Sequence, residues 1–367
     1  MVVWIQNPFD NLPGEGFRKM RYSLMAEAFA RAGHDVVIWS SDFSHATKRR
    51  RVLSGEPPPH IGVRLVKTLP YYRNVSLRRV VSHAVYARRF ERDAMRAVEG
   101  GLVRPGLVIT SFPTISAAEA SIRLARRLGS PVAVDIQDAW PETFERFAPR
   151  WALAPLRAKA RRVFREADFV TGVCDRYREL TGRADYYRAY LGIERTAPSP
   201  AGRDPDGVVR LVYSGNLGRS YDLETIVKAV RADGSMGLDV AGFGEFSADC
   251  PRVRFHGLLP AAALAELYAR CDIGVIPMRD DSWVGVPNKM FDYAAAGLRI
   301  VSSLGGEAAA LVAKYGCGAT YSPGDAASFA EAVGKCAGIG RGASVALCDA
   351  EFDAVRIYDN YVQRVLQ

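Results

Sequence analysis

Short runs of apolar residues alternate with segments of helical periodicity along the whole chain. The segment 18–32 is typical of an amphipathic helix, because Met25, Phe29 and Ala32 share one face at spacings of four and three residues. Apolar runs of strand length recur through the first half, at 2–5, 35–39, 63–66, 107–110, 132–135 and 169–172. This β-α-β order predicts a parallel sheet that is covered by helices on both faces.

A segment rich in proline, glycine and polar residues at 195–207 interrupts this pattern and predicts an interdomain linker. The pattern then begins again, with predicted strands at 208–213, 238–241, 253–255, 272–276, 299–302 and 319–321. A long final helix is predicted from about residue 346 to 365. We therefore expect two doubly wound α/β domains, 1–200 and 201–349, with a cleft between the carboxyl ends of their strands.

The composition is that of a folded protein. Of 367 residues, 49% are hydrophobic and 24% are charged, which excludes disorder over most of the chain. No apolar stretch is long enough to cross a membrane, and the N-terminus does not have the pattern of a signal peptide. Six cysteines are scattered without a C-x-x-C pair, which indicates buried thiols rather than disulfides, a zinc site or a redox motif. We expect a cytoplasmic protein without a metal site.

The net charge is unevenly distributed along the chain. Residues 1–200 contain 33 Lys and Arg against 20 Asp and Glu, a net charge of +13. Residues 201–367 contain 16 against 20, a net charge of −4. This division indicates that the two halves meet different partners, and it leaves nucleic acid, an anionic membrane surface and a phosphorylated substrate open.

A glycine-containing turn follows the first predicted strand of the second half. Gly215 and Gly218 separate that strand from a helix that starts near Tyr221. Such a turn directs backbone N–H groups and a helix N-terminus toward a phosphate or diphosphate, and Arg219 would add a charge-assisted contact. The alternative is a tight turn in which the glycines only relieve steric crowding.

The segment 285–297 predicts a short helix that opens at Pro287 and closes at Gly297. Lys289 lies in its first turn, where the helix dipole disfavours a cation unless an anionic ligand binds there. Asp292 follows on the same face and would accept ribose hydroxyls. Alternatively, Lys289 and Asp292 form an ion pair on a solvated helix.

Two loops of the first half carry further candidates. Beyond the strand at 132–135, Asp138 is placed to contact a sugar hydroxyl or a reacting oxygen, with helix capping as the alternative. The loop 7–21 does not match a dinucleotide fingerprint, because Lys19 stands where a third glycine is needed, and this argues against an NAD-dependent oxidoreductase. Its remaining candidates suit an anionic group, and they are Gly14, Gly16, Arg18 and Arg21.

The order and spacing of these segments resemble the family-4 glycosyltransferases of the GT-B architecture, and most closely the bacterial polysaccharide enzymes similar to N-acetylfucosamine transferases. The resemblance covers most of the chain and is carried by residues 32–36, 110–113, 135–142, 213–218, 241–244, 287–297, 305–307, 316–318 and 322–325. It implies two Rossmann-like domains that face each other across a cleft. The first would bind the acceptor and the second a nucleotide-sugar donor, while a helix at about 350–367 would pack back on the first domain.

The resemblance also implies an activity and site residues. A hexosyltransferase would move a sugar, with retention of anomeric configuration and without a cofactor or metal, to a saccharide acceptor. We expect this acceptor to be lipid-linked and to belong to surface polysaccharide synthesis. Lys289 and Arg219 would contact the diphosphate and stabilise it as it leaves, and Asp292 would contact the ribose. The other predicted donor residues are Gly215, Asn216, Gly242 and Asn288. The predicted acceptor residues are Gly14, Gly16, Arg18, Arg21 and Ser111.

The sequence departs from the family pattern in three places. Val284 and Asp292 stand where many members have two glutamates, so the sugar contact of the first glutamate is not carried over. Asn216 and Tyr221 replace the usual Arg and Lys of the phosphate loop, which leaves more of the charge to Arg219 and Lys289. A histidine of the first domain is also replaced, and Asp138 is our candidate for the residue nearest the chemistry.

A helix predicted at 77–98 is relevant to whether the first domain binds a membrane. Its basic side carries Arg78, Arg89, Arg92 and Arg96, and its opposite side carries Val80, Ala84, Ala87, Ala94 and Val98. One interpretation is a solvated basic face over a buried apolar one. The other is docking of the first domain on the anionic inner face of the cytoplasmic membrane, which the charge of +13 favours.

Three other functions are alternatives to glycosyl transfer. A nucleotide-sugar epimerase of the same fold would need acid and base groups around the sugar and would use no acceptor. A non-catalytic subunit that binds the donor or a lipid is supported by Val284, which stands in place of an acid. A nucleic-acid-binding role rests on positive charge alone and lacks a recognisable module.

Overall fold

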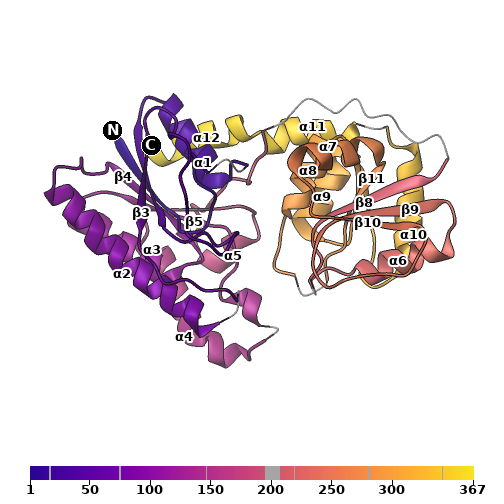
Figure 1. Ribbon diagram of the computed structural model, residues 1–367, viewed down its shortest axis with the longest axis horizontal. Helices are drawn as coiled ribbons and strands as arrows, with labels where there is room; N and C mark the ends of the chain where they lie inside the picture. Colours follow the sequence, from indigo (N-terminus) through magenta and orange to yellow (C-terminus); the bar gives the residue numbers. More distant parts are fainter. Residues whose placement is uncertain are drawn as a thin grey trace. The chain divides into compact units, whose positions relative to one another are not determined.

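The chain divides into two compact units in the computed structural model (Figure 1). The first unit comprises Met1–Tyr190 and Ala354–Gln367, and the second comprises Leu191–Asp353. The structure describes residues 1–15, 18–73, 76–145, 147–194, 207–218, 220–279, 282–340 and 342–367.

A parallel sheet of seven strands forms the centre of the first unit, in the order β3-β2-β1-β4-β5-β6-β7. The six strands predicted for this half are confirmed, and the two-residue β7 was not predicted. Their bounds are β1 (Val2–Gln6), β2 (Asp35–Ser41), β3 (Ile61–Val66), β4 (Leu107–Phe112), β5 (Val132–Ile136), β6 (Phe169–Gly172) and β7 (Tyr187–Arg188).

Helices cover both faces of this sheet because successive side chains of a strand point to opposite sides. Val3 and Ile5 of β1 pack against α1 (Arg21–Arg31) and α12 (Ala354–Leu366). Trp4 lies on the other face, against α2 (Leu77–Glu99) and α3 (Ile115–Leu128). The remaining helices of this unit are α4 (Arg150–Glu166), which packs beside α3, and the short η1 (Glu142–Phe144) and α5 (Tyr177–Thr181).

The buried side of α2 includes Ala87 and Ala94, as predicted, but it is rotated away from Val80 and Ala84. Tyr86 and Phe90 form its core contacts: the Tyr86 hydroxyl donates to the Trp39 carbonyl at 2.9 Å, and the Phe90 ring lies 5.7 Å from that of Trp39. These large rings determine how the helix is rotated, because they bury more apolar area than the small residues expected there. Val80 therefore stays 63% exposed, and Ala84 is exposed as well.

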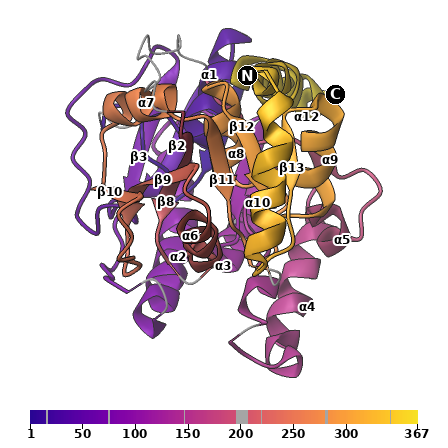
Figure 2. The same ribbon diagram turned by 90° about the vertical axis from the view of Figure 1, so that its right-hand side faces the viewer.

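The second unit also has a parallel sheet, in the order β10-β9-β8-β11-β12-β13. All six strands predicted for this half are confirmed, as β8 (Val209–Asn216), β9 (Met236–Phe243), β10 (Val253–Gly257), β11 (Ile273–Ile276), β12 (Arg299–Ser302) and β13 (Gly318–Thr320). α6 (Leu223–Ala232) and α10 (Ala326–Lys335) pack together on one face (Figure 2). The other helices are α7 (Ala261–Arg270), α8 (Asn288–Ala295), α9 (Gly306–Tyr315), η2 (Cys336–Gly338) and α11 (Ala343–Leu347).

The predicted long final helix is broken. α11 runs into a π-helical turn, η3 (Cys348–Phe352), and α12 begins only at Ala354. Asp353 between them is extended, with ψ of 115°, and pairs with Ile193. The continuous-helix prediction was wrong because this pairing and the packing of the Phe352 ring on Phe291, at 4.4 Å, stop the helix.

The chain first passes from the first unit to the second between Tyr190 and Leu191, ten residues before the predicted boundary. Ala189 belongs to the core of the first unit, whereas the Ile193 N–H donates to the Phe352 carbonyl within the second unit at 2.8 Å. Residues 195–206 of the predicted linker lie outside the described residues. None of the described helices has both the length and the apolarity that a membrane span requires. All six cysteines are buried, as predicted, and none of them forms a disulfide.

Candidate functional site

Lys289 lies at the start of α8 against two aromatic rings, which also contact each other. Pro287 has the extended backbone of an N-cap residue and Lys289 follows in the first turn. The Lys289 ammonium lies 3.9 Å from the ring centroid of Tyr221 and 4.8 Å from that of Tyr213, and the residue is only 8% exposed. Burial lowers the pKa of Lys289 to about 8, although Asp292 one turn later opposes this shift. The site therefore holds a cation that lacks its normal hydration.

Two glycines make room beside this ammonium. Gly215 and Gly242 face each other at the ends of β8 and β9, with φ of 129° and 152°. A Cβ atom at Gly242 would lie 1.8 Å from the Gly215 carbonyl oxygen, and one at Gly215 would lie 3.0 Å from Lys289 Nζ. Only glycine fits these positions, and the bare backbone lets a ligand approach the ammonium closely.

Hydrogen bonds from α8 to the sheet fix the position of Lys289. The Tyr293 hydroxyl accepts from the Ser214 N–H at 3.1 Å, one residue before Gly215. Its ring lies over Gly274 of β11, where a Cβ atom would come within 2.3 Å of ring atoms. No local sequence pattern distinguishes Tyr213, Tyr293 or Gly274 from ordinary core residues, and sequence reasoning did not identify them.

The remaining predicted donor residues lie around this point. Asn216 is exposed at the end of β8, Asn288 is exposed at the start of α8, and Asp292 is half-buried. An open cavity of about 810 Å³ is lined by Asn216 together with Gly218, Tyr221 and other residues. Arg219 lies outside the described residues. A buried cation, bare backbone and the N-terminus of α8 together suit a diphosphate.

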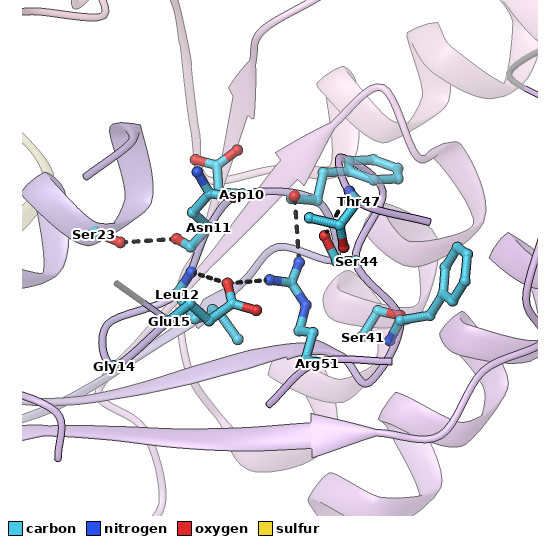
Figure 3. A network of polar contacts seen from close by, with 12 residues as sticks. Asp10, Asn11, Leu12, Gly14, Glu15, Ser23, Ser41, Ser44, Thr47 and Arg51 are labelled. Atoms are coloured by element: carbon cyan, nitrogen blue, oxygen red, sulfur yellow. Dashed lines mark hydrogen bonds and ion pairs between the residues drawn. The ribbon is translucent and has the colours of Figure 1, made fainter. Parts of the chain in front are cut away.

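In the first unit, contacts with a neighbouring segment hold the loop at Gly14 in one conformation (Figure 3). The Gly14 carbonyl accepts from the N–H groups of Ser54 and Gly55, at 2.9 and 3.2 Å. Gly14 has φ of 88°, and a Cβ atom there would lie 2.5 Å from the Gly55 carbonyl oxygen. The buried Glu15 carboxylate accepts from the Arg51 guanidinium at 2.6 Å and from the Leu12 N–H at 2.7 Å.

Of the predicted acceptor residues, the structure brings two together. Gly14 and the exposed Arg18 line an open cavity of about 400 Å³, with Asn11, Ser54 and Glu56 among its other lining residues. Polar side chains are among those that line this cavity, and its size suits a small saccharide group. Gly16 lies outside the described residues.

Arg21 points into the first unit and not toward a ligand site. Its guanidinium binds Asp135 through two hydrogen bonds of 2.7 Å, and it also donates to the carbonyl groups of Ala189 and Tyr190. Arg21 is 3% exposed, so we assign it to the interior and withdraw its acceptor role. Ser111 is 1% exposed within β4, and we withdraw its acceptor role on the same ground.

Asp138 is separated from Asp135 and lies at the surface beyond β5. Surrounding protein still raises the pKa of its carboxyl group, and Arg79 on α2 partly opposes this. Burial alone would raise the pKa of Asp135 as well, but its bonds with Arg21 hold the value below the usual range. The two carboxyl groups thus differ in role. Asp135 pairs with Arg21 inside the first unit, whereas Asp138 is accessible to a ligand.

Comparison with known proteins agrees with this architecture. The model of a glycosyl transferase 4-like domain matches residues 21–190, and the model of glycosyl transferases group 1 matches residues 209–338. A comparison with curated proteins finds no match.

Solved structures extend the similarity to the fold of the whole chain. Sucrose-phosphate synthase from Thermosynechococcus elongatus has a TM-score of 0.75 at 15% identity, with 100% of this chain and 98% of that chain covered. HepE from Anabaena, solved in complex with UDP, has a TM-score of 0.69 at 15% identity and covers 100% and 99%. WaaG, a glycosyltransferase involved in lipopolysaccharide biosynthesis, has a TM-score of 0.55 at 13% identity and covers 98% and 95%. The chain therefore belongs to the group 1 glycosyltransferases and has the GT-B fold that the sequence predicts.

Proposed function

We propose that this glycosyltransferase binds a nucleotide-diphosphate sugar at Lys289 and transfers the sugar, with retention of anomeric configuration, to a saccharide acceptor. The observation that carries the proposal is the Lys289 ammonium, which lies against the bare backbone of Gly215, with Gly242 facing Gly215 on the next strand. A diphosphate placed there would supply the counter-charge that this buried cation needs. HepE is solved with UDP and also with UDP-glucose, which supports UDP-sugars as the first donors to test.

In the proposed reaction, the bond between the anomeric carbon and the diphosphate breaks as the acceptor oxygen attacks from the same face. The acceptor proton passes to the departing phosphate oxygen, which gives a glycoside and a nucleoside diphosphate. Lys289 stabilises the negative charge that develops on the leaving group, and Arg219 and the N-terminus of α8 add to this. Asp138 would bind an acceptor hydroxyl in the first unit.

A donor screen tests this function directly. Thermal unfolding is measured with UDP-, GDP- and ADP-sugars, and a donor at one hundred times its Kd stabilises the protein by about 2.7 kcal/mol. Release of nucleoside diphosphate with lipid and saccharide extracts then measures transfer. Donor binding without release would indicate a non-catalytic subunit, and a new nucleotide-sugar formed without acceptor would indicate an epimerase.

We expect activity to be independent of metal. The basic side chains named above neutralise the diphosphate, and the described residues bring together no group of three or more His, Cys, Asp or Glu side chains that could hold an ion. Protein treated with EDTA should retain most of its turnover. Loss of turnover in EDTA that Mg²⁺ or Mn²⁺ restores would contradict this expectation.

The acceptor we propose is lipid-linked, in surface polysaccharide synthesis, and reached from the inner face of the cytoplasmic membrane. The support is the exposed side of α2, which combines apolar and basic residues. Leu77 and Val80 are 85% and 63% exposed, and Val81 is 50% exposed. Arg78, Arg92 and Arg96 are exposed along the same helix, whereas Arg89 is half-buried and donates to the Lys67 carbonyl. Apolar residues flanked by arginines suit the interface of an anionic bilayer.

Vesicle flotation tests this docking. We expect binding to vesicles that contain phosphatidylglycerol, weak binding to neutral ones and release at about 0.5 M salt. Replacing Arg78, Arg92 and Arg96 by Ser should weaken binding at least tenfold, since each charge contributes about 1 kcal/mol. The matched control replaces Arg231, Arg254 and Arg270 of the second unit. Equal flotation with neutral and anionic vesicles, or equal effects of the two triple variants, would refute electrostatic docking.

A further inference from the structure

Large apolar side chains are exposed to solvent where α4 begins. Trp151 in its first turn is 79% exposed, and Phe147 just before the helix is 70% exposed. The exposed residues that follow Trp151 on the same face, at spacings of three and four residues, are Ala154, Pro155 and Ala158. The buried residues of α4 lie on its other side, and they are Leu153, Ala160, Val163 and Phe164. We call residues 147–158 the apolar start of α4.

Basic residues continue the outward face toward the end of α4. The helix contains five arginines and one lysine but only one acidic residue, Glu166. Arg161 and Arg165 are exposed and continue the spacing of the apolar residues, and Lys159 is exposed beside them. Arg162 pairs with Glu166 at 2.8 Å, which leaves the helix with an excess of positive charge. The outward face is therefore apolar over about the first two turns of α4 and cationic over about the last two.

The apolar start of α4 lies at the edge of the first sheet where the strands end. α4 connects β5 to β6, and α2 connects β3 to β4. A helix that joins two parallel strands begins at the edge where the first of them ends. Both helices pack beside α3 and lie on one side of the sheet in Figures 1 and 2. Leu77 and Val80, exposed at the start of α2, therefore share this edge with Trp151 and with Asp138.

The combination of side chains indicates the kind of partner. Exposed apolar side chains that gather in one place mark an interaction surface, and the arginines beside them favour a negatively charged partner. Double-stranded nucleic acid would pair with the arginines but would offer the tryptophan no apolar contact. An anionic bilayer meets both needs, because tryptophan favours the region between headgroups and acyl chains, while basic side chains bind the headgroups. A helix with these two kinds of side chain lies in the plane of such an interface.

We propose that the apolar start of α4 inserts into the headgroup region of an anionic bilayer and anchors the first unit there. Phe147 and Trp151 enter between the headgroups, and Arg161 and Arg165 bind the phosphate groups. This inference rests on the proposed docking of the first unit, and it adds an apolar contact by a second helix to the charge on α2. Because Asp138 lies at the same edge, the anchored unit presents that edge to a lipid-linked acceptor.

Trp151 can report its own insertion, because it is the most exposed of the five tryptophans. Its emission shifts to shorter wavelength when the indole ring leaves water. We expect this shift for the full chain on vesicles that contain phosphatidylglycerol, together with quenching by phospholipids that carry bromine on their acyl chains. Trp151→Phe should bind these vesicles as the parent protein does but should lose the shift and the quenching. Trp140→Phe, at a half-buried position, should keep both.

Flotation with the same vesicles measures how much the apolar contact contributes to affinity. Phe147→Ser/Trp151→Ser should weaken binding about tenfold or more, because serine removes the apolar area that enters the bilayer. The matched control is Val103→Ser/Leu258→Ser, at positions that are 63% and 76% exposed. Val103 lies before β4 at the opposite edge of the first sheet, and Leu258 belongs to the second unit. This control should change binding by less than about twofold.

Three results would overturn the insertion. The first is flotation of the parent protein without a change in Trp151 emission, and the second is an equal loss of binding in the two double variants. The third is a shift of Trp151 emission that follows protein concentration or added duplex DNA but not vesicles, which would identify a second copy or nucleic acid as the partner. Donor binding needs no vesicles, so the thermal shift with UDP-sugars distinguishes failure of insertion from failure of the proposed transfer.

Discussion

Lys289→Met should lower kcat/KM at least a hundredfold. Methionine keeps most of the side-chain volume that packs against Tyr213 and Tyr221 but removes the charge. One charge-assisted contact to a leaving group contributes about 3 kcal/mol to transition-state stabilisation, and here it acts in a site where the residue is only 8% exposed. Steady-state kinetics of the folded variant measure the loss.

The control for this variant is Lys335→Met on α10, where the lysine side chain is 61% exposed and pairs with Glu331. It should change kcat/KM by less than twofold. A loss below threefold in Lys289→Met would exclude the ammonium as the group that stabilises the diphosphate.

The pH dependence of donor binding gives an independent measure of the same group. The pKa of Lys289 is about 8 in the free protein, and a bound diphosphate raises it because the charged form is favoured. Donor affinity should therefore be level from pH 7 to 7.5 and should fall as the pH rises through 8 toward 9. Lys289→Met should bind the donor weakly and without this fall.

The donor side of the site was predictable because its residues lie at places that the sequence marks. Gly215 and Gly242 follow predicted strands, and Lys289 lies in the first turn of a predicted helix. Adjacent parallel strands bring such ends to one edge of a sheet. The two tyrosines that hold Lys289 were not predicted as such, because side-chain direction at a strand end depends on packing with distant residues.

The acceptor side was predicted less well, since pairing there joins residues far apart in the sequence. Arg21 and Asp135 are 114 residues apart, and each alone has the position of a ligand-binding residue. The same limitation explains the final helix, where helical periodicity continues through Asp353 but its pairing with Ile193 breaks the helix.

The pair formed by Arg21 and Asp135 should be the most sensitive point for stability in the first unit. Arg21 and Asp135 have side chains that are 1% and 0% exposed, and Asp135 also accepts from the hydroxyls of Tyr22 and Thr171, at 2.8 and 2.6 Å. Arg21→Met leaves this carboxylate buried without its counter-charge. We expect the free energy of unfolding to fall by about 3–5 kcal/mol, measured by urea denaturation.

Arg31→Met provides the matched control for that loss. Arg31 lies on the same helix and pairs with Asp359 of α12, but both side chains are nearly half exposed, so its removal should cost less than about 1 kcal/mol.

The stability of Arg21→Met should also depend on pH. In this variant the buried Asp135 binds a proton more readily in the folded than in the unfolded chain. Lowering the pH from 7 to 5 should therefore raise the stability of this variant relative to the parent protein, whose paired Asp135 has a lowered pKa and loses its contribution only below about pH 4. Equal losses of stability for Arg21→Met and Arg31→Met would show that the buried pair contributes no more than an exposed one. If an Arg21→Met/Asp135→Leu double variant regains part of the lost stability, the uncompensated charge of Asp135 is the cause of the loss.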